Sequence, residues 1–339
     1  LRTDASTDLA ELEMFLDEAR LMAQLCHHGI AQVLEVGTTG DGSYFVAVEH
    51  VPGASLQTTL QTAARLGVAL PLAFGVGVVT AVARALHHAH GRRRPDGRHL
   101  EIVHRDVTPA NIMISSEGGV KLIDFGIARF FERRPHTQVG MVRGSPGYLA
   151  PEQLRGGVID RRTDVFALGI VLYELTTQRR CFRTDSDFET MDRIVKGRIV
   201  TPTSFDPRYP PELEAILLKA MALDPDQRYL TAEAFRQALA AYAPRLGPVA
   251  TAADVAACLR EVWRDGADEP EIREATASDA DADADAPAAA IATARHLEAA
   301  ALARSIRPVD EAATTTPRLP VSPPEPSPAA TSTTATSAS

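Results

Sequence analysis

The 339-residue sequence is poor in cysteine and tryptophan and has no excess of positive charge. It contains three cysteines and one tryptophan, and its formal net charge is −9. Cys26, Cys181 and Cys258 are too few and too widely spaced for a disulfide framework or a zinc site, so a reducing, cytoplasmic compartment is predicted. The acidic balance disfavours nucleic acid as a partner, because phosphate binding favours a basic surface.

Long hydrophobic runs and targeting signals are also scarce. No apolar run approaches the roughly 18 residues that cross a bilayer, so we expect no membrane span. No signal peptide is recognisable, and the first residue is leucine rather than methionine. We therefore expect either a fragment or a gene product whose start is misplaced.

Hydrophobic periodicity predicts a mixed N-terminal part followed by a helical remainder. Residues 9–26 have helical spacing, whereas 30–37 and 43–51 have the composition of strands joined by a glycine-containing turn. Further helices are predicted over 71–90 and 164–177, within 210–245 and after Thr251, and short β-like runs over 112–114 and 120–123. From residue 266 onward the chain has too little apolar surface to offset ordering, which predicts disorder.

Three short motifs follow one another in the middle of the chain. They are HRDVTPAN at 104–111, DFG at 124–126 and GSPGYLAPE at 144–152. Their order and spacing match the protein-kinase signature, and about nine matching positions make coincidence negligible. Over residues 9–245 the chain resembles the eukaryotic-type serine/threonine protein kinases of bacteria.

The resemblance implies an α+β fold of the bilobal protein-kinase type, with a mostly helical C-lobe and a truncated N-lobe. Residues 1–51 would form a partial N-lobe with helix C and two strands, and residues 52–245 the C-lobe. A C-terminal helix is expected over 246–265, followed by a disordered tail over 266–339.

Asp106, Asn111 and Asp124 are the candidate catalytic residues. Phosphoryl transfer depends mostly on positioning and charge neutralisation. By resemblance, Asp106 accepts a hydrogen bond from the substrate hydroxyl, while Asn111 and Asp124 supply oxygen ligands to Mg²⁺. The alternative is a turn or helix-cap role, which their joint occurrence disfavours. The implied cofactors are ATP and Mg²⁺, and the implied partners are protein substrates with Ser or Thr, in bacterial signalling.

Other positions correspond to the nucleotide-binding part of such kinases. Glu18 lies where a helix glutamate pairs with the strand lysine that grips the α- and β-phosphates; without the resemblance it is a solvated helix glutamate. Glu49, His50 and Val51 lie at the hinge, where backbone groups bind adenine, and Val48 is the gatekeeper. The alternative for the hinge residues is simply the end of a strand.

A further group has structural roles by resemblance. Glu152 and Arg228 match a buried ion pair of the lower lobe, and Asp164 would anchor the backbone of the catalytic loop. An apolar stack that links the two lobes comprises Met22, Val33, His104 and Phe125.

Arg105, Thr137 and Ser145 are candidate regulatory residues. In similar kinases the arginine before the catalytic aspartate helps to receive a phosphate on the activation loop, which makes the two hydroxyls candidate acceptors. Thr137 is the better candidate, because Ser145 lies in the segment that would face the substrate. Both residues are equally well interpreted as loop hydroxyls with no regulatory role.

The sequence departs from the kinase pattern in two respects. Thr108 stands where serine/threonine kinases usually have a lysine that contacts the γ-phosphate. No glycine-rich loop and no strand lysine precede Glu18, and LRTD at 1–4 resembles what directly follows that lysine.

Two hypotheses of different classes follow from this pattern. The chain is an active kinase whose N-terminal end is missing from the sequence, or a kinase-like scaffold or pseudokinase with weak or no transfer. The three intact candidate catalytic residues favour the first. A metal-dependent phosphohydrolase is disfavoured, since hydrolysis has no use for GSPGYLAPE.

Overall fold

The structure is a computed structural model that describes residues 22–39, 44–94, 96–125, 145–247 and 252–264. All of them belong to one compact unit. Most of the helix predicted over 9–26 and the whole predicted tail from 266 lie outside the described residues.

The described strands form two small sheets. Strands β1 (Val33–Thr38) and β2 (Tyr44–Val48) pair in antiparallel fashion, with an irregularity between Val33 and Glu35. Strands β3 (Gly53–Ser55), β4 (Ile112–Ser115) and β5 (Val120–Leu122) form an antiparallel three-stranded sheet in that order. The predicted strands and β-like runs are confirmed, with shifts of a few residues at their ends.

The helical elements account for most of the described residues. In chain order they are α2 (Leu56–Leu66), α3 (Leu72–His90), η1 (Pro109–Asn111), η2 (Pro146–Tyr148), α5 (Pro151–Arg155), α6 (Arg161–Thr177), α7 (Asp187–Val195), α8 (Pro202–Phe205), α9 (Pro211–Ala220), η3 (Pro225–Gln227), α10 (Ala232–Tyr242), η4 (Ala243–Leu246) and α11 (Ala252–Arg264). Side-chain caps begin several of them: Ser55 for α2, Asp160 for α6 and Thr231 for α10 each accept a hydrogen bond from a first-turn backbone N–H.

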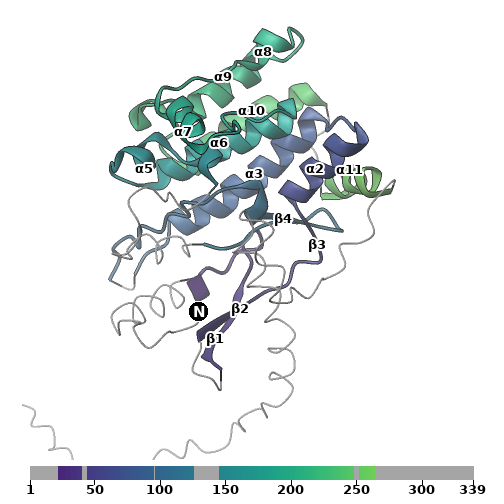
Figure 1. The fold of residues 1–339 in the computed structure, drawn as a ribbon. Helices are drawn as coiled ribbons and strands as arrows, with labels where there is room; N and C mark the ends of the chain where they lie inside the picture. Colours follow the sequence, from purple (N-terminus) through teal and green to yellow (C-terminus); the bar gives the residue numbers. More distant parts are fainter. Residues whose placement is uncertain (1–21, 40–43, 95, 126–144, 248–251, 265–339) are drawn as a thin grey trace, which may run out of the picture. The chain divides into compact units, whose positions relative to one another are not determined.

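Helices α3 and α6 are central to the hydrophobic core. They pack against each other and α10 packs against both, as Figure 1 shows. In α6 every residue from Thr163 to Leu175 is buried, which explains why its sequence is apolar on all sides rather than along one face. This rigid centre carries Asp164, on which the candidate active site depends.

Helix α3 bears on the expectation that the chain has no membrane span. It is the one helix, among the residues that the structure describes, with the length and hydropathy of a membrane span. Its apolar residues are explained by packing, because the side chains from Phe74 to His90 are largely buried against α6 and α10. An apolar stretch of this length is also what a buried core helix requires.

Candidate active site

The candidate catalytic residues meet at one end of a β-hairpin. Asn111 immediately precedes β4. A single residue, Ile123, separates the end of β5 from Asp124. The backbone N–H of Ile123 donates to the carbonyl of Asn111 at 2.9 Å. This hydrogen bond closes the open end of the hairpin and holds Asn111 and Asp124 at neighbouring positions.

A pair of hydrogen bonds ties Asp106 to Asn111. The amide nitrogen of Asn111 donates to the Asp106 carbonyl at 2.9 Å and to its carboxylate Oδ2 at 2.8 Å. Both bonds use the Nδ2 group of Asn111, so its amide oxygen is the atom left to face a ligand. Asp106 and Asn111, five positions apart in the sequence, therefore bring a carboxylate and an amide into direct contact.

Asp124 lies in a partly buried position close to a second carboxylate. Burial raises the pKa of the Asp124 carboxyl above its usual value, and the Asp106 carboxylate raises it further, against a lowering effect of His104. Its backbone has a φ of 58°, a left-handed conformation that costs a non-glycine residue about 1–3 kcal/mol. Such conformations concentrate at functional sites because the surrounding structure must impose them.

Asp164 holds the loop that carries Asp106. Its Oδ2 accepts hydrogen bonds from the His104 backbone N–H at 2.8 Å and from His90 Nε2 at 2.7 Å, while Oδ1 accepts from the Arg105 backbone N–H at 2.8 Å. Arg105 has a φ of 69°, and these bonds support that left-handed backbone. Burial raises the pKa of Asp164, but the hydrogen bond and charge of His90 leave it below its usual value.

The donor set at this end of the hairpin fits Mg²⁺ with nucleotide phosphates. Among the described residues, no group of three or more His, Cys, Asp or Glu side chains is placed to hold a metal ion. Mg²⁺ is usually bound by one or two carboxylates together with substrate phosphates and water. Asp124 and the amide oxygen of Asn111 provide such an incomplete set, and a cation there would offset the repulsion between Asp124 and Asp106.

Residues 49–51, the expected hinge, directly follow β2, and each has a different environment. The Glu49 carboxylate accepts from Lys121 Nζ at 2.8 Å and from the Gln32 backbone N–H at 3.1 Å, so it braces β5 and the segment before β1. His50 is exposed and Val51 is buried. In the described part of the chain no hydrogen bond uses the Val51 N–H, which leaves it as a backbone donor.

Two aromatic rings of the expected apolar stack are in contact. The His104 and Phe125 ring centroids lie 4.5 Å apart, and His104 Nε2 lies 2.9 Å from the Ile123 carbonyl. Met22 is partly buried against the main core, and Val33 is partly buried at the start of β1. The His104 ring thus joins the backbone beside Asp124 to the loop that carries Asp106.

Glu152 and Arg228 form a buried, two-pronged ion pair. Arg228 Nη1 and Nη2 donate to Glu152 Oε1 and Oε2 at 2.7 and 2.8 Å. Thr163 Oγ1 donates to the same carboxylate at 2.8 Å. Burial raises the pKa of Glu152, but the hydrogen bonds and charge of Arg228 hold it below its usual value.

The candidate regulatory and phosphate-aligning residues are only partly described. Ser145 precedes η2 and accepts from the Tyr148 backbone N–H through its own carbonyl at 3.0 Å. Glu18 and Thr137 lie outside the described residues. The Arg105 carbonyl accepts from Gln153 Nε2 at 3.1 Å, which connects the catalytic loop to α5.

A hydrogen-bonded polar group that includes Tyr148 of the GSPGY segment was not anticipated from the sequence. Tyr148 Oη donates to Glu174 Oε2 at 2.6 Å, and Arg180 Nη1 contacts both, at 2.8 Å from Tyr148 and 3.0 Å from Glu174. Burial raises the pKa of Glu174 above its usual value, against the lowering effects of Tyr148 and Arg180. No local sequence signal marks this group, because its members lie up to 32 residues apart.

Comparison with known proteins supports one family. The protein kinase domain family matches residues 2–239. The chain is 44% identical over 228 residues to the tyrosine-protein kinase MasK of Myxococcus xanthus, covering 67% of this chain and 35% of MasK. It is 37% identical over 245 residues to the serine/threonine-protein kinase PknB of Mycolicibacterium smegmatis, covering 70% of this chain and 37% of PknB.

The fold agrees with a solved kinase domain. The crystal structure of the Mycobacterium tuberculosis PknI kinase domain superposes with a TM-score of 0.52 at 27% identity, covering 69% of this chain and 80% of that one. The chain spans only about a third of the length of the curated relatives it matches, at 35% and 37% for the two named above. The expected bilobal kinase-like fold, with its mostly helical C-lobe, is confirmed.

Proposed function

Because this chain belongs to the protein kinase family, we propose that it transfers the γ-phosphate of ATP to the hydroxyl of a protein serine or threonine. The observation that carries the proposal is the contact of Asp106 with Asn111, beside Asp124. All three residues lie at the open end of the β4–β5 hairpin, opposite its turn. Two carboxylates and an amide oxygen at one place suit phosphoryl transfer, which needs charge neutralisation and an oriented hydroxyl.

Each residue of this group has one role in the proposed reaction. The Asp106 carboxylate accepts the hydrogen bond of the acceptor hydroxyl and directs its oxygen toward the phosphorus, while the Asn111 amide keeps that carboxylate in place. Asp124 and the Asn111 amide oxygen would hold Mg²⁺, which supplies charge neutralisation on the phosphate oxygens. The Val51 N–H and the neighbouring backbone would bind adenine.

Serine or threonine as the acceptor rests on the GSPGYLAPE segment and on relatives. Several similar proteins are named serine/threonine-protein kinases, including PknB and PrkC, whereas MasK is named a tyrosine-protein kinase. Phosphoamino-acid analysis of the product distinguishes the two acceptor classes directly.

Asp106→Asn tests the proposal. We expect phosphate transfer to fall by about 10²–10⁴-fold, the usual contribution of a positioned acid or base. Nucleotide binding should change little, since the asparagine keeps the size of the side chain. Asp124→Asn should instead weaken binding of the Mg²⁺–nucleotide complex. The measurements are phosphate transfer by mass-spectrometric mapping and nucleotide affinity by titration calorimetry.

A matched control separates this from a general effect of removing an acid. Asp96→Asn changes an exposed aspartate and should leave transfer unchanged. Full activity of Asp106→Asn would contradict the assignment. A folded wild-type chain that binds nucleotide but transfers phosphate to no acceptor would support the scaffold alternative.

A further inference from the structure

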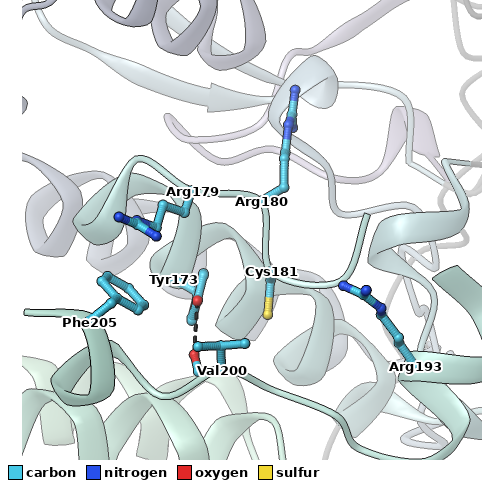
Figure 2. Close-up of a pocket in the computed structure, with 7 residues that line it drawn as sticks. All are labelled: Tyr173, Arg179, Arg180, Cys181, Arg193, Val200 and Phe205. Atoms are coloured by element: carbon cyan, nitrogen blue, oxygen red, sulfur yellow. Dashed lines mark hydrogen bonds between the residues drawn. The ribbon is translucent and has the colours of Figure 1, made fainter. Parts of the chain in front are cut away.

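A pocket with a volume of about 320 Å³ lies at the C-terminal end of α6. Tyr173, Cys181, Val200 and Phe205 form its uncharged wall. The other lining residues are three arginines: Arg179, Arg180 and Arg193. Figure 2 shows Arg179 and Arg193 on opposite sides of Cys181, with Arg180 extending away from Val200.

Among the described residues, no acidic side chain lines this pocket, and the charged groups of its lining are all guanidinium groups, in an otherwise acidic chain. The Arg179 guanidinium lies over the Phe205 ring, 4.3 Å from its centroid, and within the described residues no carboxylate pairs with it. Arg193 pairs with Glu189 at 2.8 Å, but both side chains are exposed. Exposed pairs of this kind contribute about 0.2–1 kcal/mol, so an incoming carboxylate can replace Glu189.

The pocket is joined to the segment that, by family resemblance, faces the substrate. Arg180 donates to Tyr148 Oη in η2, and α7, which carries Arg193, packs against η2. The Glu174 carboxylate nearby is already occupied by Tyr148 and Arg180. An incoming peptide therefore meets guanidinium groups here rather than a free carboxylate.

We propose that this pocket binds acidic side chains of the peptide substrate, so that the kinase prefers acceptors flanked by aspartate or glutamate. The inference rests on the proposed function, because it assigns a peptide-recognition role to the same reaction. Guanidinium–carboxylate contacts supply the binding, as charge-assisted hydrogen bonds stronger than neutral ones. The Phe205 ring keeps the Arg179 guanidinium in place by a cation–π contact.

The chain itself contains a peptide of this chemistry. Residues 274–287 read EATASDADADADAP, in which Thr276 and Ser278 precede aspartates at every second position. This sequence is a natural probe for the pocket. Because an intramolecular copy competes at high effective concentration, the binding test uses a chain in which that copy is neutralised by Asp279→Asn, Asp281→Asn, Asp283→Asn and Asp285→Asn.

The binding test compares two fluorescein-labelled peptides, the natural 274–287 sequence and the same sequence with asparagine for all four aspartates. In that background we expect fluorescence anisotropy to show about tenfold tighter binding of the aspartate peptide, equivalent to ~1.4 kcal/mol. Arg179→Gln with Arg193→Gln should abolish the difference. Arg180 is left intact, because it also holds Tyr148 and Glu174.

Arg98→Gln is the charge-matched control. Its side chain is exposed and forms an ion pair with Asp96 at 3.8 Å, outside the pocket, so the aspartate preference should persist. Equal binding of the two peptides, a preference that survives the pocket substitutions, or equal loss in Arg98→Gln would each overturn the inference.

Transfer to the two peptides separates this inference from the proposed function. Phosphorylation of both peptides with equal KM, together with equal binding, would refute the pocket and leave the kinase activity standing. Pocket-dependent binding of the aspartate peptide without transfer to any peptide would refute the activity and retain an acidic-peptide site. We expect a lower KM for the aspartate peptide, and loss of that advantage in the pocket variant.

Discussion

The guanidinium of Arg228 joins several backbone segments besides binding Glu152. Its Nε donates to the Ala222 carbonyl at 2.7 Å and its Nη1 to the Arg162 carbonyl at 3.1 Å, while the group lies 4.7 Å from the Phe166 ring centroid. A buried arginine with its donors satisfied contributes geometry as well as charge. Removing one partner leaves the other charge buried without compensation.

Arg228→Met should therefore lower the free energy of unfolding by about 3–5 kcal/mol, the usual effect of breaking a buried pair. The measurement is denaturant unfolding followed by circular dichroism. Lys196→Met removes an exposed cation that pairs with Asp192 and should change stability by less than about 0.5 kcal/mol. A loss below 1 kcal/mol for Arg228→Met would show that the pair does not brace the lobe.

At the scale of elements, a histidine cluster joins the segment before β1 to α3. The ring centroid of His27 lies 4.2 Å from that of His28 and 4.9 Å from that of His88 in α3. His27 Nδ1 accepts from the Gly29 backbone N–H at 3.0 Å, which requires that nitrogen to be unprotonated. A proton on Nδ1 would remove this acceptor and add charge beside other cations.

The cluster lowers the pKa of His27 to about 4, chiefly through burial and then through the charges of its neighbours. Those neighbours are His28, His88, Arg84 and Lys121. Burial also lowers the pKa of His88. Between the ordinary His27 pKa of 6.5 and about 4, the unfolded chain binds more protons than the folded one, so stability falls as pH falls through this range.

We expect the melting temperature to drop by about 2–4 °C between pH 6.5 and 5 through this residue, the effect of ~1 kcal/mol in a domain of this size after the shift is discounted for solvent screening of a partly exposed ring. His27→Asn should flatten that slope, because an asparagine carbonyl can accept the Gly29 N–H and does not titrate. His99→Asn, at an exposed position, is the control and should keep the slope. An unchanged slope in His27→Asn would contradict the cluster's role.

At the scale of the whole described chain, α11 packs beyond the part that matches the kinase family, which ends at residue 239. Its buried residues Val255, Leu259 and Val262 recur at helical spacing, and the helix contacts α2 and α3. Gly118, in the β4–β5 turn, has a φ of 82°, and a Cβ there would lie 1.8 Å from the Ala252 carbonyl. The hairpin that carries the candidate catalytic residues is thus supported from its far end by α11.

Leu259→Ala should destabilise the protein by about 2–5 kcal/mol, because the side chain is fully buried and its removal leaves a cavity. Thermal and denaturant unfolding measure this loss. Arg260→Ala, on the exposed side of the same helix, should alter stability by less than about 0.5 kcal/mol. Equal stability of the two variants would mean that α11 is not docked in solution.

Residue type and spacing were enough to indicate strands β1, β2, β4 and β5, the core helices α3 and α6 and the family, whereas the short strand β3 was not predicted. The spacing of apolar residues predicts α3 and the β1–β2 hairpin, because each element buries its apolar side chains against its neighbours. Asp106, Asn111 and Asp124 were identifiable because their chemistry and order together are rare. Their roles as catalytic and metal-binding residues remain a prediction, which the proposed variants address.

The pairings across long separations could not be deduced from the sequence. His90 with Asp164, 74 residues apart, and Glu49 with Lys121, 72 residues apart, depend on which helices and strands pack together. The same holds for Arg180, whose contact with Tyr148 places a guanidinium at the GSPGYLAPE segment. Composition and order along the chain specify which chemical groups exist, whereas only packing of the hydrophobic core decides which of them meet, because burial brings distant segments together and excludes the water that would otherwise separate them.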